Sequence, residues 1–182
     1  MFRLLLIFFF TFFILNTKAD NKEKIIANLN DTLNFSFEFE QNINGKIETG
    51  NCTIQYPKKI YCKYNGGSNK ILVSNSKSVV VKTNTGYYRY PIKQTPLNLI
   101  LDKEFMLKKI NNMEEKIIDN KFINYKFIEN DNEINIFFDL KTFHLRGWQT
   151  TDIYQNLNIT YLWSIKTNQI LNKDLFKLPL QY

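Results

Sequence analysis

The 182-residue sequence predicts a mainly β protein with a few helices, built on antiparallel strands. Several stretches alternate strictly between apolar and polar residues, as at Leu33, Phe35, Phe37 and Phe39, which is the period of a strand with one wet face. The order is a helix, a run of strands, helices and then more strands, without the strand-helix alternation of a parallel sheet. Such a sheet can pack as a sandwich or curl into a barrel, with the helices on or inside the curve.

The first half of the mature chain contains one predicted helix and a series of hairpins. Residues Asn21 to Leu29 carry apolar side chains at helical spacing, which predicts a short amphipathic helix. Turn residues then separate strands predicted at Leu33 to Gln41, Lys46 to Tyr56, Ile60 to Tyr64, Lys70 to Ser74 and Ser78 to Thr83. The segment Tyr87 to Ile92 is an edge strand or an extended connection, because Pro91 cannot donate a hydrogen bond to a ladder.

The second half begins with two predicted helices. Thr95 is the expected N-cap and Pro96 the first residue of a short apolar helix that ends at Leu101. A second helix is expected over Lys103 to Asn111. Further strands are predicted at Lys116 to Asp119, Phe122 to Glu129, Glu133 to Leu140, Phe143 to Thr151 and Leu157 to Ile165, and Leu171 to Leu178 closes the chain.

The N-terminal segment predicts export. An apolar run from Leu4 to Leu15 follows a short basic start, and as a helix it would rise only about 18 Å, less than the roughly 30 Å of a hydrocarbon core. Thr17-Lys18-Ala19 is a small-x-small cleavage site. We therefore expect residues 1–19 to be a cleaved signal peptide and residues 20–182 to form one domain. An uncleaved N-terminal anchor is the alternative.

Composition excludes several classes of function. The formal net charge of +7 comes mostly from lysine, with only Arg3, Arg89 and Arg146 to supply the planar fork that favours phosphate, so we expect no nucleic-acid partner. One histidine and two cysteines cannot build a four-ligand zinc cage, so no metal site is expected. An exported hydrolase would have to use His144, and the sequence contains no Gly-x-Ser-x-Gly elbow.

The two cysteines predict a disulfide. Cys52 and Cys62 lie symmetrically about Pro57, so a hairpin centred there places them opposite one another on adjacent strands. An exported chain meets an oxidising compartment in which the bond would persist. Two reduced cysteines in the core are the alternative.

Residue parity assigns a set of large side chains to one side of the sheet. The set comprises Phe35, Phe37, Phe39, Cys52, Ile54, Tyr56, Ile60, Cys62 and Tyr64. The residues alone favour an ordinary filled core, because an aromatic stripe usually reflects packing. A wall around a partly empty cavity is the other interpretation.

Four segments together resemble the periplasmic outer-membrane lipoprotein carriers of the LolA family. These segments are GNCTIQYP from Gly50 to Pro57, KILVSN from Lys70 to Asn75, TPLNLIL from Thr95 to Leu101 and GWQTTD from Gly147 to Asp152. Each motif is weak alone, but they occur in the family's order after a signal peptide. The resemblance extends over nearly the whole mature chain.

The resemblance implies an incomplete, unclosed antiparallel β-barrel with an α-helical lid, whose apolar hollow shelters the acyl chains of lipoproteins. It implies a non-enzymatic periplasmic carrier without a cofactor, monomeric, that receives lipidated proteins from an inner-membrane ABC-type extractor and delivers them to an outer-membrane acceptor or to the outer membrane itself. A periplasmic sensor of mislocalised lipoproteins on the same fold is an alternative.

On this interpretation ten residues are the candidate ligand-binding residues, with the lid formed by the last three of them: Phe35, Phe37, Phe39, Ile54, Tyr56, Ile60, Tyr64, Leu97, Ile100 and Leu101. Many family members carry an arginine that clasps the lid just before the proline of the first segment. Here that position is Tyr56, and a phenol offers one donor where guanidinium offers five. We therefore expect a weaker or differently made clasp.

Overall fold

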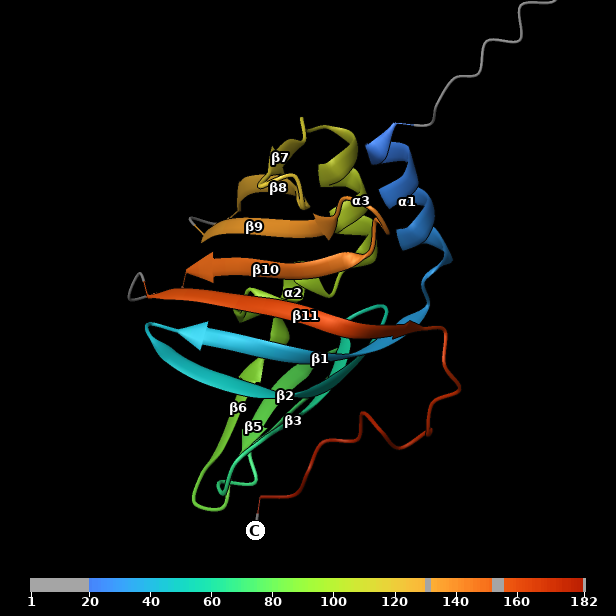
Figure 1. The fold of residues 1–182 in the computed structure, drawn as a ribbon. Coiled ribbons are helices and arrows are strands. Elements are labelled where there is room, and N and C mark those ends of the chain that lie inside the picture. The colour runs from blue at the N-terminus through green and yellow to red at the C-terminus, as the bar shows by residue number, and fades with distance from the viewer. Residues whose placement is uncertain (1–19, 130–131, 152–155, 182) are drawn as a thin grey trace, which may run out of the picture.

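The structure is a computed structural model that describes residues 20–129, 132–151 and 156–181. The expected signal peptide, residues 1–19, lies outside the described residues, as do positions 130 and 131 between two of the predicted strands. The strands form a single antiparallel sheet, which curves around the helices (Figure 1). No helix of the described part is long and apolar enough to cross a membrane.

The elements follow the predicted order closely. The helical elements are α1 (Asn21–Asp31), the 3-10 turn η1 (Ile92–Gln94), α2 (Leu97–Ile100) and α3 (Lys103–Asn111). The strands are β1 (Asn34–Ile43), β2 (Lys46–Gln55), β3 (Lys59–Tyr64), β4 (Ile71–Asn75), β5 (Ser78–Lys82), β6 (Tyr87–Pro91), β7 (Lys116–Ile118), β8 (Phe122–Glu129), β9 (Asn132–Asp139), β10 (Leu145–Thr151) and β11 (Leu157–Thr167).

Pairing between β1 and β11 gives the sheet its shape. Neighbouring strands are consecutive in the chain everywhere except at this central pair, in the order β6-β5-β4-β3-β2-β1-β11-β10-β9-β8-β7. The edge strands β6 and β7 are not paired with each other, so the barrel is unclosed, as predicted. The chain from η1 to α3 connects these two edges and therefore has to cross the concave side of the sheet.

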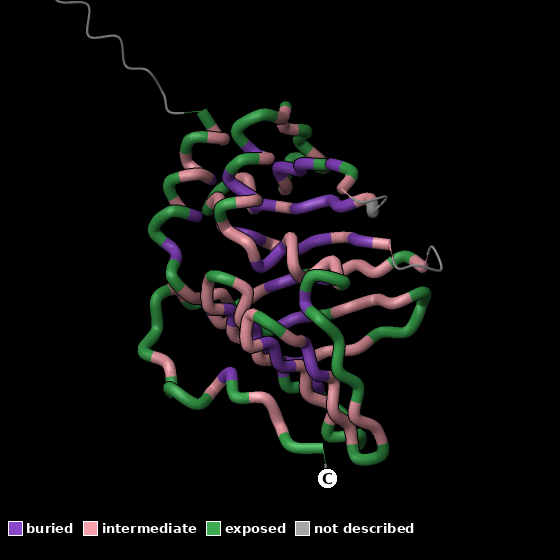
Figure 2. Tube along the Cα trace, turned by 180° about the vertical axis from the view of Figure 1, so that it is seen from behind, coloured by how far each residue is buried: buried purple, intermediate pink, exposed green. Residues whose placement is uncertain are grey.

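The core lies between the concave face and the helices. Helix α1 packs against α3, and their buried residues Ile25, Leu29, Met106 and Ile110 join one apolar cluster with the inward-facing residues of the strands. Figure 2 shows these buried segments along the strands behind the helices. On β1, Phe35, Phe37 and Phe39 are buried and Glu38 and Glu40 are exposed, which confirms the predicted alternation.

Two local predictions were wrong, and one predicted strand is a single residue shorter than expected. Thr95 does not cap α2, because its hydroxyl donates to the Ile92 carbonyl at 2.8 Å and the helix begins only at Leu97, after Pro96. Leu33 does not share the inward face of β1, since it precedes the strand and is 65% exposed. The predicted strand at Lys116 to Asp119 ends at Ile118, where Asp119 takes a left-handed φ of 52°.

The structure also decides between alternatives that the sequence leaves open at the edge strand, the C-terminal segment and the cysteines. Tyr87–Pro91 is an edge strand, and Pro91 pairs opposite Ser78 where no further strand requires its missing donor. Residues 171–181 contain no strand, but Phe176 within them is buried. A disulfide joins Cys52 and Cys62 directly across the β2–β3 pair, as the hairpin symmetry predicted.

Candidate ligand-binding cavity

A cavity of about 250 Å³ lies between the concave face of the sheet and α2. Strands from both halves of the sheet and the lid segment, residues 95–101, contribute to it. Its lining residues are Phe37, Phe39, Gln41, Ile43, Cys52, Ile60, Cys62, Tyr64, Lys70, Leu72, Val81, Pro96, Leu97, Ile100, Trp148, Thr150, Asn158 and Thr160. The apolar members of this set lie on both sides of the hollow, so a ligand inside it would be enclosed mainly by hydrocarbon.

Aromatic rings form the floor of the cavity near its centre. Phe37 meets Trp148 of β10 edge to face, with ring centroids 6.5 Å apart. Phe39 meets Tyr64 of β3 in the same manner at 5.0 Å. Edge-to-face pairs of this kind hold their rings in fixed orientations. The floor is therefore a preformed surface that does not depend on a ligand for its shape.

Gly50 makes the approach of Phe39 and Tyr64 possible. It lies on β2 directly between these two residues in register, opposite Phe39 on β1 and opposite Tyr64 on β3. A Cβ at this position would lie 2.3 Å from the Lys63 carbonyl oxygen and 2.8 Å from Cε1 of Phe39. A side chain here would displace the floor, so the glycine is required by the close approach of the neighbouring strands.

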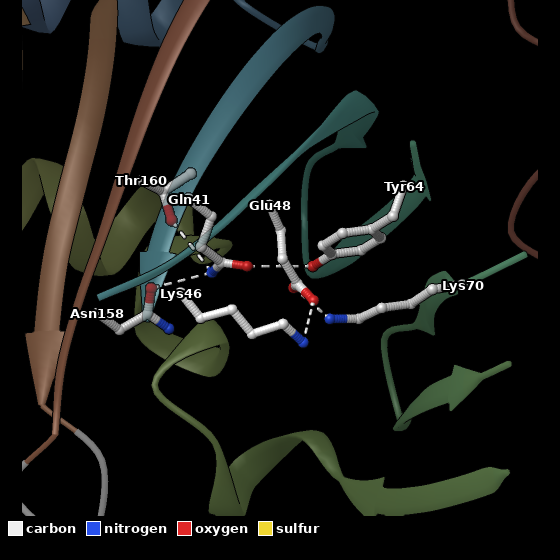
Figure 3. Close-up of polar contacts among 7 residues, drawn as sticks. All are labelled: Gln41, Lys46, Glu48, Tyr64, Lys70, Asn158 and Thr160. Carbon is white, nitrogen blue, oxygen red and sulfur yellow. Dashed lines mark hydrogen bonds and ion pairs between the residues drawn. The ribbon is translucent and has the colours of Figure 1, made fainter. Parts of the chain in front are cut away.

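One end of the cavity is polar (Figure 3). The Tyr64 hydroxyl donates to Oε1 of Gln41 at 3.3 Å, and Nε2 of Gln41 donates to Oδ1 of Asn158 at 3.0 Å and to Oγ1 of Thr160 at 3.3 Å. Gln41 is near the end of β1, and Asn158 and Thr160 are near the start of β11, so the central strand pair brings these groups together. Along β1, the cavity lining therefore changes from apolar at Phe37 to polar at Gln41.

An ion cluster adjoins this polar end. The Lys70 ammonium, which lines the cavity, pairs with Oε2 of Glu48 and lies 4.1 Å from the centroid of the Tyr64 ring. Lys46 pairs with the other carboxylate oxygen of Glu48 at 3.0 Å. Burial opposes ionisation of Glu48, but the hydrogen bonds and charges of both lysines outweigh it, and its pKa is lowered from 4.5. Burial and the nearby Glu48 charge raise the pKa of Tyr64, so its hydroxyl keeps the proton that it donates.

The lid is fastened at Lys58, in the turn between β2 and β3. The Lys58 backbone N–H donates to the Leu101 carbonyl at 2.8 Å, and the Lys58 ammonium lies 2.9 Å from Oδ2 of Asp102. Asp102 also caps α3 by accepting from the Phe105 N–H at 3.1 Å. We call the two contacts of Lys58 the lid clasp. The group that holds the lid is thus a lysine two residues beyond Tyr56, in line with the expectation of a differently made clasp.

Tyr56 itself packs rather than clasps. Its ring lies 6.0 Å from that of Phe35 and 5.9 Å from the Lys103 ammonium, which in turn donates to the Asn30 and Thr32 carbonyls at the C-terminal end of α1. Among the described residues, no hydrogen bond to the Tyr56 hydroxyl is found. Burial raises the pKa of this hydroxyl. The side chain therefore acts as an apolar wedge between β1 and the start of α3.

The structure distributes the ten candidate residues over three places. Those that line the cavity are Phe37, Phe39, Ile60, Tyr64, Leu97 and Ile100. Phe35 and Tyr56 line a separate hollow of only about 20 Å³ beneath α1. Ile54 and Leu101, exposed by 1% and 0%, lie within the packed core and line neither space.

Twelve of the eighteen lining residues are not among the ten candidates that the sequence predicted. Ile43 and Gln41 continue the parity of Phe37 and Phe39, so a longer strand prediction would have included Ile43. Leu72 and Val81 follow the same rule on β4 and β5. Trp148, Thr150, Asn158 and Thr160 carry no local signal, because only the β1–β11 pairing places their strands beside β1.

The structure offers little support for chemistry at His144. This residue is half-buried beside Asn28, Thr32 and Phe143 around the small hollow beneath α1. No hydrogen bond or ion pair of its imidazole is found in the part of the chain that the structure describes. Nor does that part contain a group of three or more His, Cys, Asp or Glu residues arranged to hold a metal ion.

The fold and the cavity define an unclosed antiparallel half-barrel with a helical segment over an apolar hollow. The model of the family described as outer membrane lipoprotein carrier protein LolA matches residues 30–179. The chain therefore belongs to the LolA family. No curated protein matches it.

Solved structures resemble this fold at very low identity. An uncharacterized conserved protein from Thermus thermophilus has a TM-score of 0.52 at 7% identity, over 88% of this chain and 95% of that one. A LolA superfamily protein from Nitrosomonas europaea has a TM-score of 0.45 at 6% identity, over 87% and 99%. LprF from Mycobacterium bovis has a TM-score of 0.42 at 10% identity, over 84% and 96%.

Proposed function

We propose that this protein is a non-enzymatic periplasmic carrier of lipidated proteins, which shelters their acyl chains in the cavity beneath α2. The observation that supports this most is a preformed hollow of about 250 Å³, floored by Phe37, Phe39 and Trp148 and covered by Leu97 and Ile100, in a chain of the LolA family. A dry engineered cavity of about 150 Å³ already binds benzene. The hollow is therefore large enough to take part of one acyl chain with the lid in place.

Loading a complete lipid anchor requires the lid to move. Burying about 14 methylenes at roughly 0.8 kcal/mol each stabilises one chain by about 11 kcal/mol, and two or three chains would exceed the practical ceiling of noncovalent affinity. Displacing the lid re-exposes Ile100 and Leu101, which are almost fully buried, at about 1.5–3 kcal/mol each. This cost offsets part of the gain and keeps the cargo releasable without nucleotide hydrolysis on this chain.

The ion pair of the lid clasp is weak enough to permit this motion. The side chains of Lys58 and Asp102 are each 27% exposed, and an ion pair with that much solvent contact contributes at most about 1 kcal/mol. In this proposal an inner-membrane ABC-type extractor supplies the lipidated protein and an outer-membrane acceptor, or the outer membrane itself, receives it. The carrier works as a monomer and without a cofactor.

Purification of the exported protein from its own periplasm, followed by mass spectrometry of the bound material, tests the proposal. We expect a copurifying lipidated protein. A Val81→Trp variant, which adds bulk at a half-buried lining position, should lose it, and an Ile128→Trp variant, at a 68% exposed position on β8, should retain it. Wild-type protein without lipidated cargo, or undiminished cargo on Val81→Trp, would overturn the proposal.

A further inference from the structure

The polar end of the cavity holds a matched pair of charges that an apolar sheltering function does not itself require. Lys70 lines the cavity, and Glu48 lies behind it on β2. Their side chains are only 19% and 15% exposed, although each carries a charge. The Lys70 ammonium is also held over the face of Tyr64. The Lys70 ammonium is therefore held in place, and its charge is paired, before any ligand enters.

A lysine without such a partner would favour a different ligand. An ammonium at the mouth of an apolar hollow attracts the carboxylate of a free fatty acid, because a charge-assisted hydrogen bond forms as the chain is buried. Here the Lys70 ammonium already forms an ion pair with the Glu48 carboxylate. An anionic head would have to break the existing pair and would then lie beside a second negative charge, which is the repulsive element that specificity commonly requires.

The third charge of the cluster lies on the solvent side. Lys46 pairs with the remaining oxygen of Glu48, but its side chain is 75% exposed and it does not line the cavity. Charges in such contact with water are strongly screened. Lys46 therefore helps to keep Glu48 ionised and offers an entering head group little attraction.

The other groups at this end are uncharged. Gln41, Asn158, Thr160 and Thr150 present amides and hydroxyls, each of which can donate and accept hydrogen bonds. Three of them already share one network through the Gln41 side chain. Ester carbonyls and alcohol hydroxyls match such groups without requiring a charge on either partner.

We propose that the Glu48–Lys70 pair makes this end of the cavity select acyl chains with an uncharged, ester-bearing glyceryl head and reject free fatty acids. The head lies against Gln41 and the tail extends toward Phe37 and Ile60. This inference rests on the proposed function, because it assigns a class of head group to the same cavity.

Calorimetric titration at pH 8 with 1-decanoylglycerol and with decanoate, both below their micellar concentrations, tests the proposal. The ratio of the two dissociation constants is the quantity measured. We expect wild-type protein to bind the ester about tenfold more tightly than the acid. In Glu48→Gln the ratio should fall about tenfold, because the released Lys70 ammonium attracts the carboxylate.

Two further variants make the result specific. Lys70→Met removes the ammonium but leaves Glu48, so the preference for the ester should persist or increase; this keeps the test decisive if Glu48→Gln does not fold. Glu40→Gln makes the same change at an exposed position on β1 and should leave the ratio at the wild-type value.

Each contrary outcome has a distinct meaning. An ester preference below about threefold in wild-type protein, an unchanged ratio in folded Glu48→Gln, or a preference lost in Lys70→Met would overturn the selectivity while acyl-chain binding stands. If wild-type protein binds neither probe, the proposed sheltering of acyl chains is itself overturned, and the selectivity falls with it.

Discussion

The Lys58 ammonium lies 2.9 Å from Oδ2 of Asp102, and this pair connects the lid to a turn that is itself firmly held. The Lys58 carbonyl accepts a hydrogen bond from the Ser74 hydroxyl at 2.8 Å, and the Pro57 carbonyl accepts one from the Ser76 hydroxyl at 3.1 Å. The turn is thus fixed to β4 and the loop after it. Movement of the lid therefore requires the Lys58 contacts to break and leaves the sheet intact.

Removal of the ion pair should loosen the lid without unfolding the protein. Asp102→Asn keeps an effective N-cap for α3 but removes the charge, and Lys58→Met removes the ammonium. Each change should lower the free energy of unfolding by at most about 1 kcal/mol and speed amide hydrogen exchange in residues 97–101. The double variant should match either single variant, because one interaction is lost in all three. Additive losses in the free energy of unfolding, or unchanged amide hydrogen exchange in residues 97–101, would contradict a clasp at this pair.

Tyr56→Phe should have almost no effect. The hydroxyl makes no hydrogen bond to any described residue, and the packing of the ring against Phe35 is retained by phenylalanine. We expect a change of less than about 0.5 kcal/mol in the free energy of unfolding and undiminished acyl-chain loading. Loss of acyl-chain loading in Tyr56→Phe would assign a polar role to this position after all.

Glu48 should stabilise the fold in a pH-dependent manner. Its pKa is lowered from 4.5 in the folded state, so its contribution is present above pH 4.5 and is lost as the pH falls through the lowered value. Glu48→Gln should therefore be less stable than wild type by at most about 1 kcal/mol at pH 7, and the difference should close in acid. Urea unfolding of both proteins between pH 7 and pH 3 measures this. A difference that is constant over this range would exclude the charged pairs as its origin.

The disulfide should contribute more than any ion pair described above. Cys52 and Cys62 are ten residues apart, and closing a loop of that length in the unfolded chain corresponds to about 3 kcal/mol. The Cys52→Ser, Cys62→Ser double variant should unfold at lower urea concentration with a larger change in exposed surface. A stability within about 0.5 kcal/mol of the oxidised wild type would mean that β-sheet pairing alone fixes this hairpin.

The local part of the fold could be predicted because it depends on period and symmetry. The alternation at Phe35, Phe37 and Phe39 fixes their face, and the position of Pro57 midway between the cysteines fixes their pairing. Parity alone says which side of the sheet a residue occupies. It does not say whether that side is filled, which is why Ile54 lies in solid core while Ile60, opposite it, lines the cavity.

The remainder depends on contacts between distant segments. Trp148 and Thr160 reach the cavity only because β11 pairs with β1, with Phe39 opposite Leu162, across more than a hundred residues of chain. The family resemblance directs attention to Tyr56 as the position of the clasp, but the turn presents the backbone and ammonium of Lys58 to the lid instead. The late start of α2 has a local cause instead, since the Thr95 hydroxyl donates to the Ile92 carbonyl and does not cap the helix.

The two tryptophans allow the central claim to be tested directly. Trp148 lines the cavity, whereas Trp163 lies outside it and donates from Nε1 to Oε2 of Glu38 at 3.0 Å. A lipopeptide with dibrominated acyl chains quenches a tryptophan only on close contact. Addition of this ligand to Trp163→Phe, which retains Trp148, should quench fluorescence strongly, and addition to Trp148→Phe should quench it little. Equal quenching in both variants, or none at Trp148, would contradict an acyl-chain site in the cavity beneath α2.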